Sequence, residues 1–188
     1  MKKFSTWLVA ILLAAGLGIV VPGPASAATS YCGLVWGSLA KNGDSTNPPS
    51  APNAPTVTNV RTGQHYCFDR MVVDLSGPTP GYAVRYVPQI VQDGSGFTIP
   101  VRGNARLQVT VRAPSYDNNG NPTYNPSNKT ELSNVAPYQT FRQVVWAGSF
   151  EGQTDLGIGV RARLPFRVFT LDGPGSGSRL VVDVAHYW

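Results

Sequence analysis

A series of short apolar runs, separated by turn residues, constrains the fold more than any other feature of this sequence. Each run is rich in Val or Ile and is bounded by Gly, Pro, Asn or Asp, as is typical of strands joined by turns. Helical periodicity is weak throughout. Without helical crossovers, the pattern predicts an all-β fold: an antiparallel β-sandwich or open barrel of about eight short strands. The expected strands are Thr56–Arg61, Phe68–Leu75, Tyr82–Val87, Ala105–Val111, Thr140–Phe150, Gly157–Leu164, Phe166–Leu171 and Arg179–His186.

The N-terminus has the three parts of a signal peptide. Two lysines precede an apolar stretch from Phe4 to Val21, and Ala25-Ser26-Ala27 is a small-residue cleavage site, so we expect residues 1–27 to be removed. An uncleaved anchor is the alternative, because about 18 apolar residues approach the length of a membrane span. The glycines and proline of this stretch favour cleavage. The expected product is secreted or extracytoplasmic and has no stable membrane span.

The remaining residues suit a single domain. Residues 28–55 are expected to form an N-terminal extension followed by a Pro/Asn-rich flexible linker from Lys41 to Pro55, and residues 56–188 the β-domain. A long insertion, residues 114–134, interrupts that domain. Tyr116 and Tyr124 would suit a binding loop, but the Asn, Pro and Ser content favours a mobile tip.

The charge of the chain is mildly basic. Its 15 Lys and Arg against 10 Asp and Glu give +5, and loss of Lys2 and Lys3 would leave 13 against 10, or +3. This excess favours an anionic cell-wall surface and lacks the dense basic clusters of nucleic-acid binders. We therefore expect no nucleic-acid partner.

The two cysteines, Cys32 and Cys67, both follow the expected cleavage site. An even number of cysteines in an oxidising compartment favours a disulfide, which would stabilise the fold by about 3–4 kcal/mol. The alternative is a catalytic thiol at Cys67 with His65 nearby in sequence.

A six-residue pattern occurs twice, at residues 70–75 and 179–184. On strands, alternate residues share a face, so each copy has one core face and points an arginine and an aspartate outward: Arg70 with Asp74, and Arg179 with Asp183. These residues could be cross-strand ion pairs of small energetic value. The alternative is an ancestral strand shared by two halves of the domain, and the repeat itself predicts internal pseudo-two-fold symmetry.

The segment from Gly157 to Arg167 alternates apolar residues with glycine and arginine. We expect its glycines and arginines to share an exposed cationic face, where forked guanidinium groups suit the carboxylates and phosphates of wall polymers. The alternative is a charged face that protects an edge strand from aggregation. The candidate polymer-binding residues are Arg161, Arg163, Arg167, Arg70 and Arg179.

The sequence contains no recognisable catalytic or cofactor motif. Its two histidines, His65 and His186, are not in a metal-binding spacing, and a site built from them with Asp183 is disfavoured. It also lacks a nucleophile elbow, phosphate loop and dinucleotide fingerprint, and has only two glutamates. We therefore expect no enzyme activity, no metal and no cofactor.

From Val57 to the C-terminus, the chain resembles the AMIN-like domains of exported actinobacterial proteins. The residues that carry the resemblance are Phe68–Asp74, Gly96–Val111, Phe150–Gly152, Gly159–Arg161, Pro165–Val168 and Arg179–Val184. AMIN domains are sandwiches of two small sheets that help to place peptidoglycan amidases or secretins on the cell wall. The resemblance implies a wall-associated binding or targeting module. Since no amidase domain is attached here, any targeted enzyme would be a separate protein.

Two functions follow as expectations. The leading one is a non-catalytic secreted module that binds peptidoglycan or another anionic wall polymer through its arginines. The alternative is a protein-interaction or inhibitory module that acts on a secreted partner enzyme through the 114–134 loop.

Overall fold

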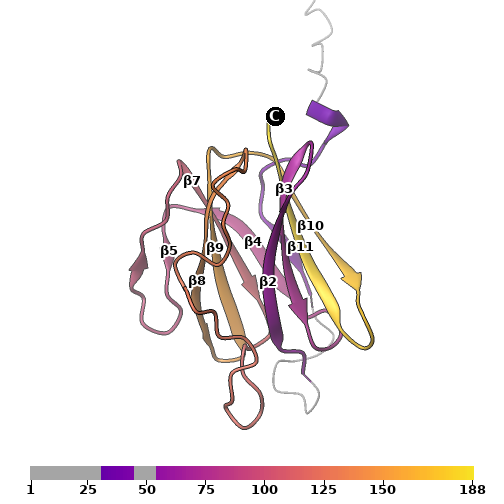
Figure 1. Cartoon of the computed structure of the whole chain (residues 1–188), viewed down its shortest axis with the longest axis vertical. Coiled ribbons are helices and arrows are strands. Elements are labelled where there is room, and N and C mark those ends of the chain that lie inside the picture. Colours follow the sequence, from indigo (N-terminus) through magenta and orange to yellow (C-terminus); the bar gives the residue numbers. More distant parts are fainter. Residues whose placement is uncertain (1–30, 45–53) are drawn as a thin grey trace, which may run out of the picture.

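The structure, a computed structural model, describes residues 31–44 and 54–188. In this part of the chain, two antiparallel sheets face one another and a small hairpin lies beside them (Figure 1). The expected signal peptide and most of the expected linker lie outside the described residues. No helix in the described ranges is long and apolar enough to cross a membrane.

The larger sheet has five strands in the order β1-β4-β7-β9-β8, and the smaller has four in the order β10-β11-β3-β2. The five strands are β1 (Lys41–Gly43), β4 (Tyr82–Val87), β7 (Ala105–Val111), β9 (Gln153–Val160) and β8 (Phe141–Phe150). The four are β10 (Phe166–Asp172), β11 (Ser178–Ala185), β3 (Phe68–Leu75) and β2 (Val57–Gln64). The hairpin pairs β5 (Ile90–Val91) with β6 (Thr98–Ile99), and η1 (Tyr31–Gly33) is a short 3₁₀ turn. The expected all-β antiparallel fold is confirmed, as an open sandwich.

The main core lies between the two sheets and follows from the alternation of the strands. Met71 and Val73 of β3 and Val182 of β11 point inward from the smaller sheet, where they meet Leu107 of β7 and Ile158 of β9. All five are fully buried. Burying side chains of this size contributes roughly 1.5–3 kcal/mol each, which makes this layer the main source of stability.

A second, smaller core lies on the outer side of the five-stranded sheet. There the cover segment, residues 88–104, packs Ile90 and Val101 onto Val145 and Ala147 of β8. Two glycines of β9 leave the necessary room: a Cβ on Gly157 would lie 2.8 Å from Ile90, and one on Gly159 would lie 1.9 Å from the carbonyl oxygen of Arg102. The expectation that these glycines lie on an exposed face is therefore wrong, since the cover segment packs on them.

Replacing Gly159 with alanine is expected to destabilise the domain by about 1–3 kcal/mol, because the new Cβ must displace the backbone of the cover segment. Denaturant unfolding monitored by tryptophan fluorescence would measure the loss. The matched control is Gly63→Ala on β2, where the nearest atom to a Cβ is 3.7 Å away. Equal stability of the two variants would contradict this role of Gly159.

The N-terminal segment, residues 31–44, is held at both ends. Cys32 forms a disulfide with Cys67, as expected. At the other end, β1 pairs with β4, so Lys41–Gly43 is a strand and not the start of a linker. Between these points, the Phe166 amide donates to the carbonyl oxygen of Gly37 at 2.9 Å. The segment thus joins the β10 side of the smaller sheet to the β4 edge of the larger one.

Candidate functional site

The outer face of the four-stranded sheet carries a charged network around one buried carboxylate. Asp183 of β11 is fully buried and accepts hydrogen bonds from two arginines on neighbouring strands. Arg70 of β3 binds it through both Nε and Nη2, at 2.6 and 2.9 Å, and Arg167 of β10 through Nε at 2.8 Å. Such charge-assisted bonds fix both guanidinium groups in place.

Aromatic rings hold the same two arginines from the sides. The Arg70 guanidinium lies 5.1 Å from the ring centre of Phe68 and 5.4 Å from that of Phe169. The Arg167 guanidinium lies 4.5 Å from the ring centre of Trp36, which the N-terminal segment supplies. Cation–π contacts of this kind pre-organise the cations while leaving part of each one open to solvent. The exposed fractions of the side chains are 24 % for Arg70 and 40 % for Arg167.

Two further arginines complete this surface, which we call the arginine face: Arg61, Arg70, Arg167 and Arg179. Arg61 of β2 binds both carboxylate oxygens of Asp74, at 2.8 and 2.9 Å, and these bonds raise the pKa of Arg61. Arg179 of β11 donates instead to the carbonyl oxygen of Asp172 at 2.7 Å. Among the described residues, Arg179 has no carboxylate partner, and its Nε is buried without a hydrogen bond.

The twofold sequence pattern is explained by direct pairing of its two copies. Strands β3 and β11 are antiparallel neighbours, with Arg70 opposite Asp183 and Asp74 opposite Arg179. The repeat therefore reflects the local two-fold symmetry of one antiparallel strand pair. Only the first of the two opposed pairs forms an ion pair, because Asp74 is bound by Arg61.

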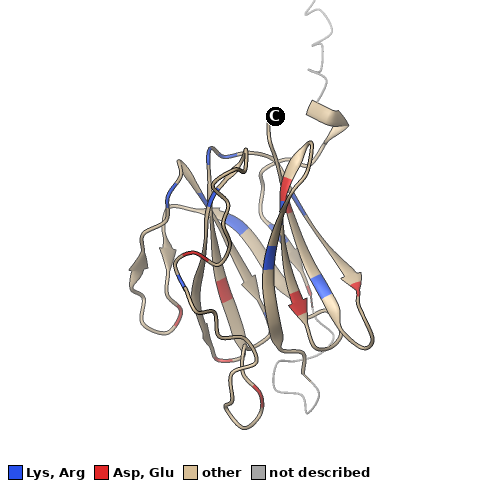
Figure 2. Ribbon diagram, in the orientation of Figure 1, with Lys and Arg blue, Asp and Glu red and all other residues tan. Residues whose placement is uncertain are grey.

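Between these side chains the sheet face is hollowed. The cavity has a volume of about 230 Å³, with Val72 and Val181 among its apolar lining residues. Four arginines face two carboxylates on this surface, which leaves an excess of two positive charges. Elsewhere both signs are interspersed over the two sheets (Figure 2). The remaining residues that line the hollow are Arg61, Thr62, Gly63, His65, Arg70, Leu171 and Arg179.

The structure separates Arg161 and Arg163 from this face. Strand β9 ends at Val160, so both lie in the loop before β10 and not on a cationic strand as expected. Arg161 donates to the carbonyl oxygen of His186, and its guanidinium lies 5.0 Å from the ring centre of Tyr187. Arg163 lies over Tyr86 and donates to the carbonyl oxygen of Ser38 at 3.1 Å. Both guanidinium groups therefore already bind the protein itself.

A family model, the AMIN-like domain, matches residues 55–186, which include both sheets apart from β1. The chain belongs to the AMIN-like domain family. Comparisons with curated proteins and with solved structures gave no match. The match confirms the resemblance seen in the sequence.

The AMIN-like domain identifies this chain as a cell-envelope module and points to an envelope or extracytoplasmic location. Domains of this family are non-catalytic envelope-binding modules. Among the described residues, no three His, Cys, Asp or Glu side chains are grouped so that they could hold a metal ion. The cysteines are joined in the disulfide, so Cys67 is not a free thiol beside His65.

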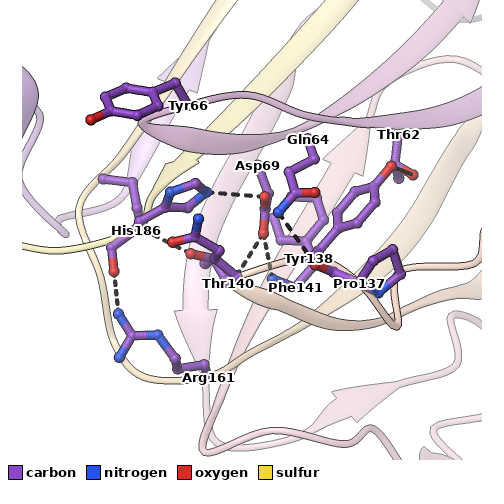
Figure 3. Close-up of polar contacts among 12 residues, drawn as sticks. Thr62, Gln64, Tyr66, Asp69, Pro137, Tyr138, Thr140, Phe141, Arg161 and His186 are labelled. Carbon is purple, nitrogen blue, oxygen red and sulfur yellow. Dashed lines mark hydrogen bonds and ion pairs between the residues drawn. The ribbon is translucent and has the colours of Figure 1, made fainter.

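A buried Asp–His pair is one polar feature of this AMIN-like domain that was not predicted from the sequence (Figure 3). His186 Nε2 lies 3.1 Å from Asp69 Oδ1, and both side chains are fully buried. The other oxygen of Asp69 accepts the backbone amides of Thr140 and Phe141, at 2.6 and 2.9 Å. The pair therefore ties β3 and the end of β11 in one sheet to the start of β8 in the other.

The strand periodicity contained a signal for this pair. Asp69 lies two residues before Met71 and so shares the core face of β3, and His186 lies two residues after Val184 of β11. Polar groups on a core face require partners. The periodicity therefore indicated that Asp69 and His186 each have a buried polar partner, although not that they are partners of each other.

The 114–134 loop packs along β8 of the AMIN-like domain. Backbone amides of Leu132 and Trp146 bond across the junction, to the carbonyl oxygens of Val144 and Lys129 respectively. The Tyr124 ring packs on Trp146, with 5.5 Å between ring centres. The loop thus shields much of the β8 edge, and its exposed tip is formed by residues 118–122.

Proposed function

We propose that this AMIN-like domain binds peptidoglycan or another anionic wall polymer through the arginine face. The observation that carries the proposal is the unneutralised guanidinium of Arg179 beside a hollow that Arg61 and Arg70 also line. A carboxylate or phosphate in this hollow would meet fixed donors and an apolar floor. Arg167 extends the surface toward Trp36, and Arg163 reaches the same N-terminal segment at Ser38.

The arginines would have different roles in binding, because their hydrogen-bond partners differ. Arg70 and Arg167 share the single negative charge of Asp183, which fixes both side chains and leaves one net positive charge between them. Arg179, which has no carboxylate partner among the described residues, would supply the second. Arg161 and Arg163, bound to backbone carbonyl oxygens, would make peripheral contacts only.

Replacing Arg179 with glutamine is expected to weaken binding to purified cell-wall sacculi roughly three- to tenfold at low salt, because one charge-assisted contact is lost. Sedimentation of the secreted protein with sacculi across a sodium chloride series would measure this. Binding of the wild type should fall as salt rises, since exposed charges are screened. Lys129→Gln is the matched control: it removes one exposed positive charge from the long loop and should leave binding unchanged.

Two outcomes would contradict the proposal. One is an absence of sedimentation at every salt concentration, and the other is an equal loss in the two variants, which would indicate a net-charge effect without a site. Sacculi stripped of covalently attached anionic polymers, compared with intact sacculi, would show which polymer supplies the negative charge.

The alternative function, capture of a secreted partner protein, rests on a cleft at the base of the long loop. This cleft has a volume of about 560 Å³ and is lined by residues including Tyr116, Asp117, Glu151 and Gly152. Replacing residues 118–120 with a shorter turn separates the two functions. Wall binding should survive the replacement, whereas capture of a partner through the loop should not.

A further inference from the structure

A polar cleft lies on the outer face of the five-stranded sheet, away from the arginine face. Its floor is formed by the outward side chains of β4, β7 and β9, among them Arg85, Gln108, Thr110 and Asp155. The turn between β5 and β6 supplies one wall, including Asp93. The cleft has a volume of about 460 Å³, the size of a small-ligand site.

Asp155 distinguishes this cleft from an ordinary solvated sheet face. It lies on the outward side of β9, yet its exposed fraction is only 5 %. Its Oδ1 accepts hydrogen bonds from the Thr110 hydroxyl and, at 3.2 Å, from the Gln108 amide. No Lys, Arg or His among the described residues lies within ion-pair distance of it. A buried carboxylate that has only neutral donors reduces the stability of the fold, which is typical of a functional position.

The charges that line the cleft cancel one another. Arg85 and Arg112 contribute two positive charges, and Asp93 and Asp155 contribute two negative ones. The cleft therefore has no net attraction for an ion, unlike the arginine face. It offers hydrogen-bond donors and acceptors side by side over the width of three strands.

We propose that this cleft is a second binding site, for an uncharged saccharide segment. A sugar hydroxyl both donates and accepts, so adjacent hydroxyls can donate to a carboxylate such as Asp155 and accept from Arg85 or Gln108. The cleft supplies both kinds of partner, and Asp155 is the anchor. This site does not depend on the arginine face, and either could exist without the other.

The proposal is tested by calorimetric titration of the secreted protein with two neutral tetrasaccharides, a β-1,4-linked N-acetylglucosamine tetramer and maltotetraose. We expect saturable binding of at least one, with a dissociation constant of about 10⁻⁴–10⁻³ M. Because the ligand is uncharged, the affinity should change less than about twofold across a salt series. Binding of only one tetramer would support the site and identify the sugar type. Binding of neither would overturn it.

Asp155→Asn is expected to reduce this affinity at least about tenfold, since a charge-assisted acceptor is lost while the shape is kept. Arg179→Gln should have no effect on it. If the arginine face is responsible for binding to sacculi, the Asp155→Asn variant should sediment with sacculi as the wild type does. Failure of one site is therefore distinguishable from failure of the other.

A stability measurement separates lost binding from lost structure. Burial raises the pKa of Asp155. The folded state thus holds this proton more tightly than the unfolded state, and stability falls as pH rises from the ordinary aspartate pKa to the raised one. Asparagine carries no charge at any pH, so the variant avoids this loss of stability. The melting temperature of Asp155→Asn at pH 7 should therefore equal or exceed that of the wild type. Should this variant fail to fold, the exposed Arg85→Gln replaces it, and tetrasaccharide affinity unchanged by Arg85→Gln would overturn the proposal.

Discussion

Replacing Asp69 with alanine is expected to lower the free energy of unfolding by about 3–5 kcal/mol, a large share of the stability of an ordinary domain. One carboxylate oxygen of Asp69 accepts hydrogen bonds from the backbone amides of Thr140 and Phe141, and the other faces the imidazole of His186. Alanine would leave these groups in the interior without an acceptor, and unpaired buried donors are costly. Urea unfolding followed by circular dichroism would measure the change.

The matched control is Asp74→Ala on the same strand. Asp74 pairs with Arg61 on the outer face, where the Arg61 side chain is half exposed, so its loss should cost no more than about 1 kcal/mol. If the two alanine variants unfolded at similar urea concentrations, the Asp69–His186 pair would not be the link between sheets that its geometry indicates.

Replacing both Cys32 and Cys67 with serine is expected to cost about 3–4 kcal/mol, because the disulfide closes a loop across 35 residues of sequence. The other contacts of the N-terminal segment near Cys32 lie at the surface, such as the long hydrogen bond from the Tyr31 amide to the carbonyl oxygen of Trp188 and the packing of Tyr31 on Tyr187. Val35 and Leu39 are largely exposed, and Trp36 is only partly buried. Without the disulfide, amides of this segment should exchange with solvent faster than those of β3 and β11.

Guanidinium chloride unfolding and amide hydrogen exchange would together measure this effect. Val35→Ala, which changes an exposed side chain on the same segment, should alter stability by less than about 0.5 kcal/mol. A double serine variant within that range of the wild type would show that the noncovalent contacts of the segment hold it without the disulfide.

Some strands could be predicted with their bounds. β3, β4 and β7 begin and end at the expected residues. Each is a run rich in Val with turn residues nearby in the sequence, and β7 also alternates strictly between apolar and polar residues. Neighbour relations could not be predicted. The two copies of the repeated pattern proved to be adjacent strands, and nothing local in the sequence fixes which strands pair.

Strand β9 was misplaced for a physical reason. It begins at Gln153 and ends at Val160, whereas the apolar alternation continues through Ala162 to Leu164. Leu164 lies in the loop, but its side chain is almost completely buried in the core. An apolar residue at this spacing therefore extends the alternating pattern beyond the real end of the strand. The early start follows from a two-residue turn at Glu151 and Gly152, whose φ angles of 47° and 80° suit a tight hairpin.

The candidate sites were only partly visible in the sequence. Arg70, Arg167 and Arg179 were identified by alternation and do share one face, but Arg61 was missed because its strand carries no repeated pattern. The polar cleft was missed entirely. Its wall comes from β5 and β6, strands of two residues each, which leave no periodic signal.

The two ends of the described chain meet at one pole of the sandwich (Figure 1). The Tyr31 amide donates to the carbonyl oxygen of Trp188 at 3.4 Å, and the Tyr31 ring packs edge-on against Tyr187. A fusion partner joined at either end would therefore be attached at this same pole of the sandwich. The partner would cover neither the arginine face nor the polar cleft, and the tip of the 114–134 loop would point away from the point of attachment (Figure 1).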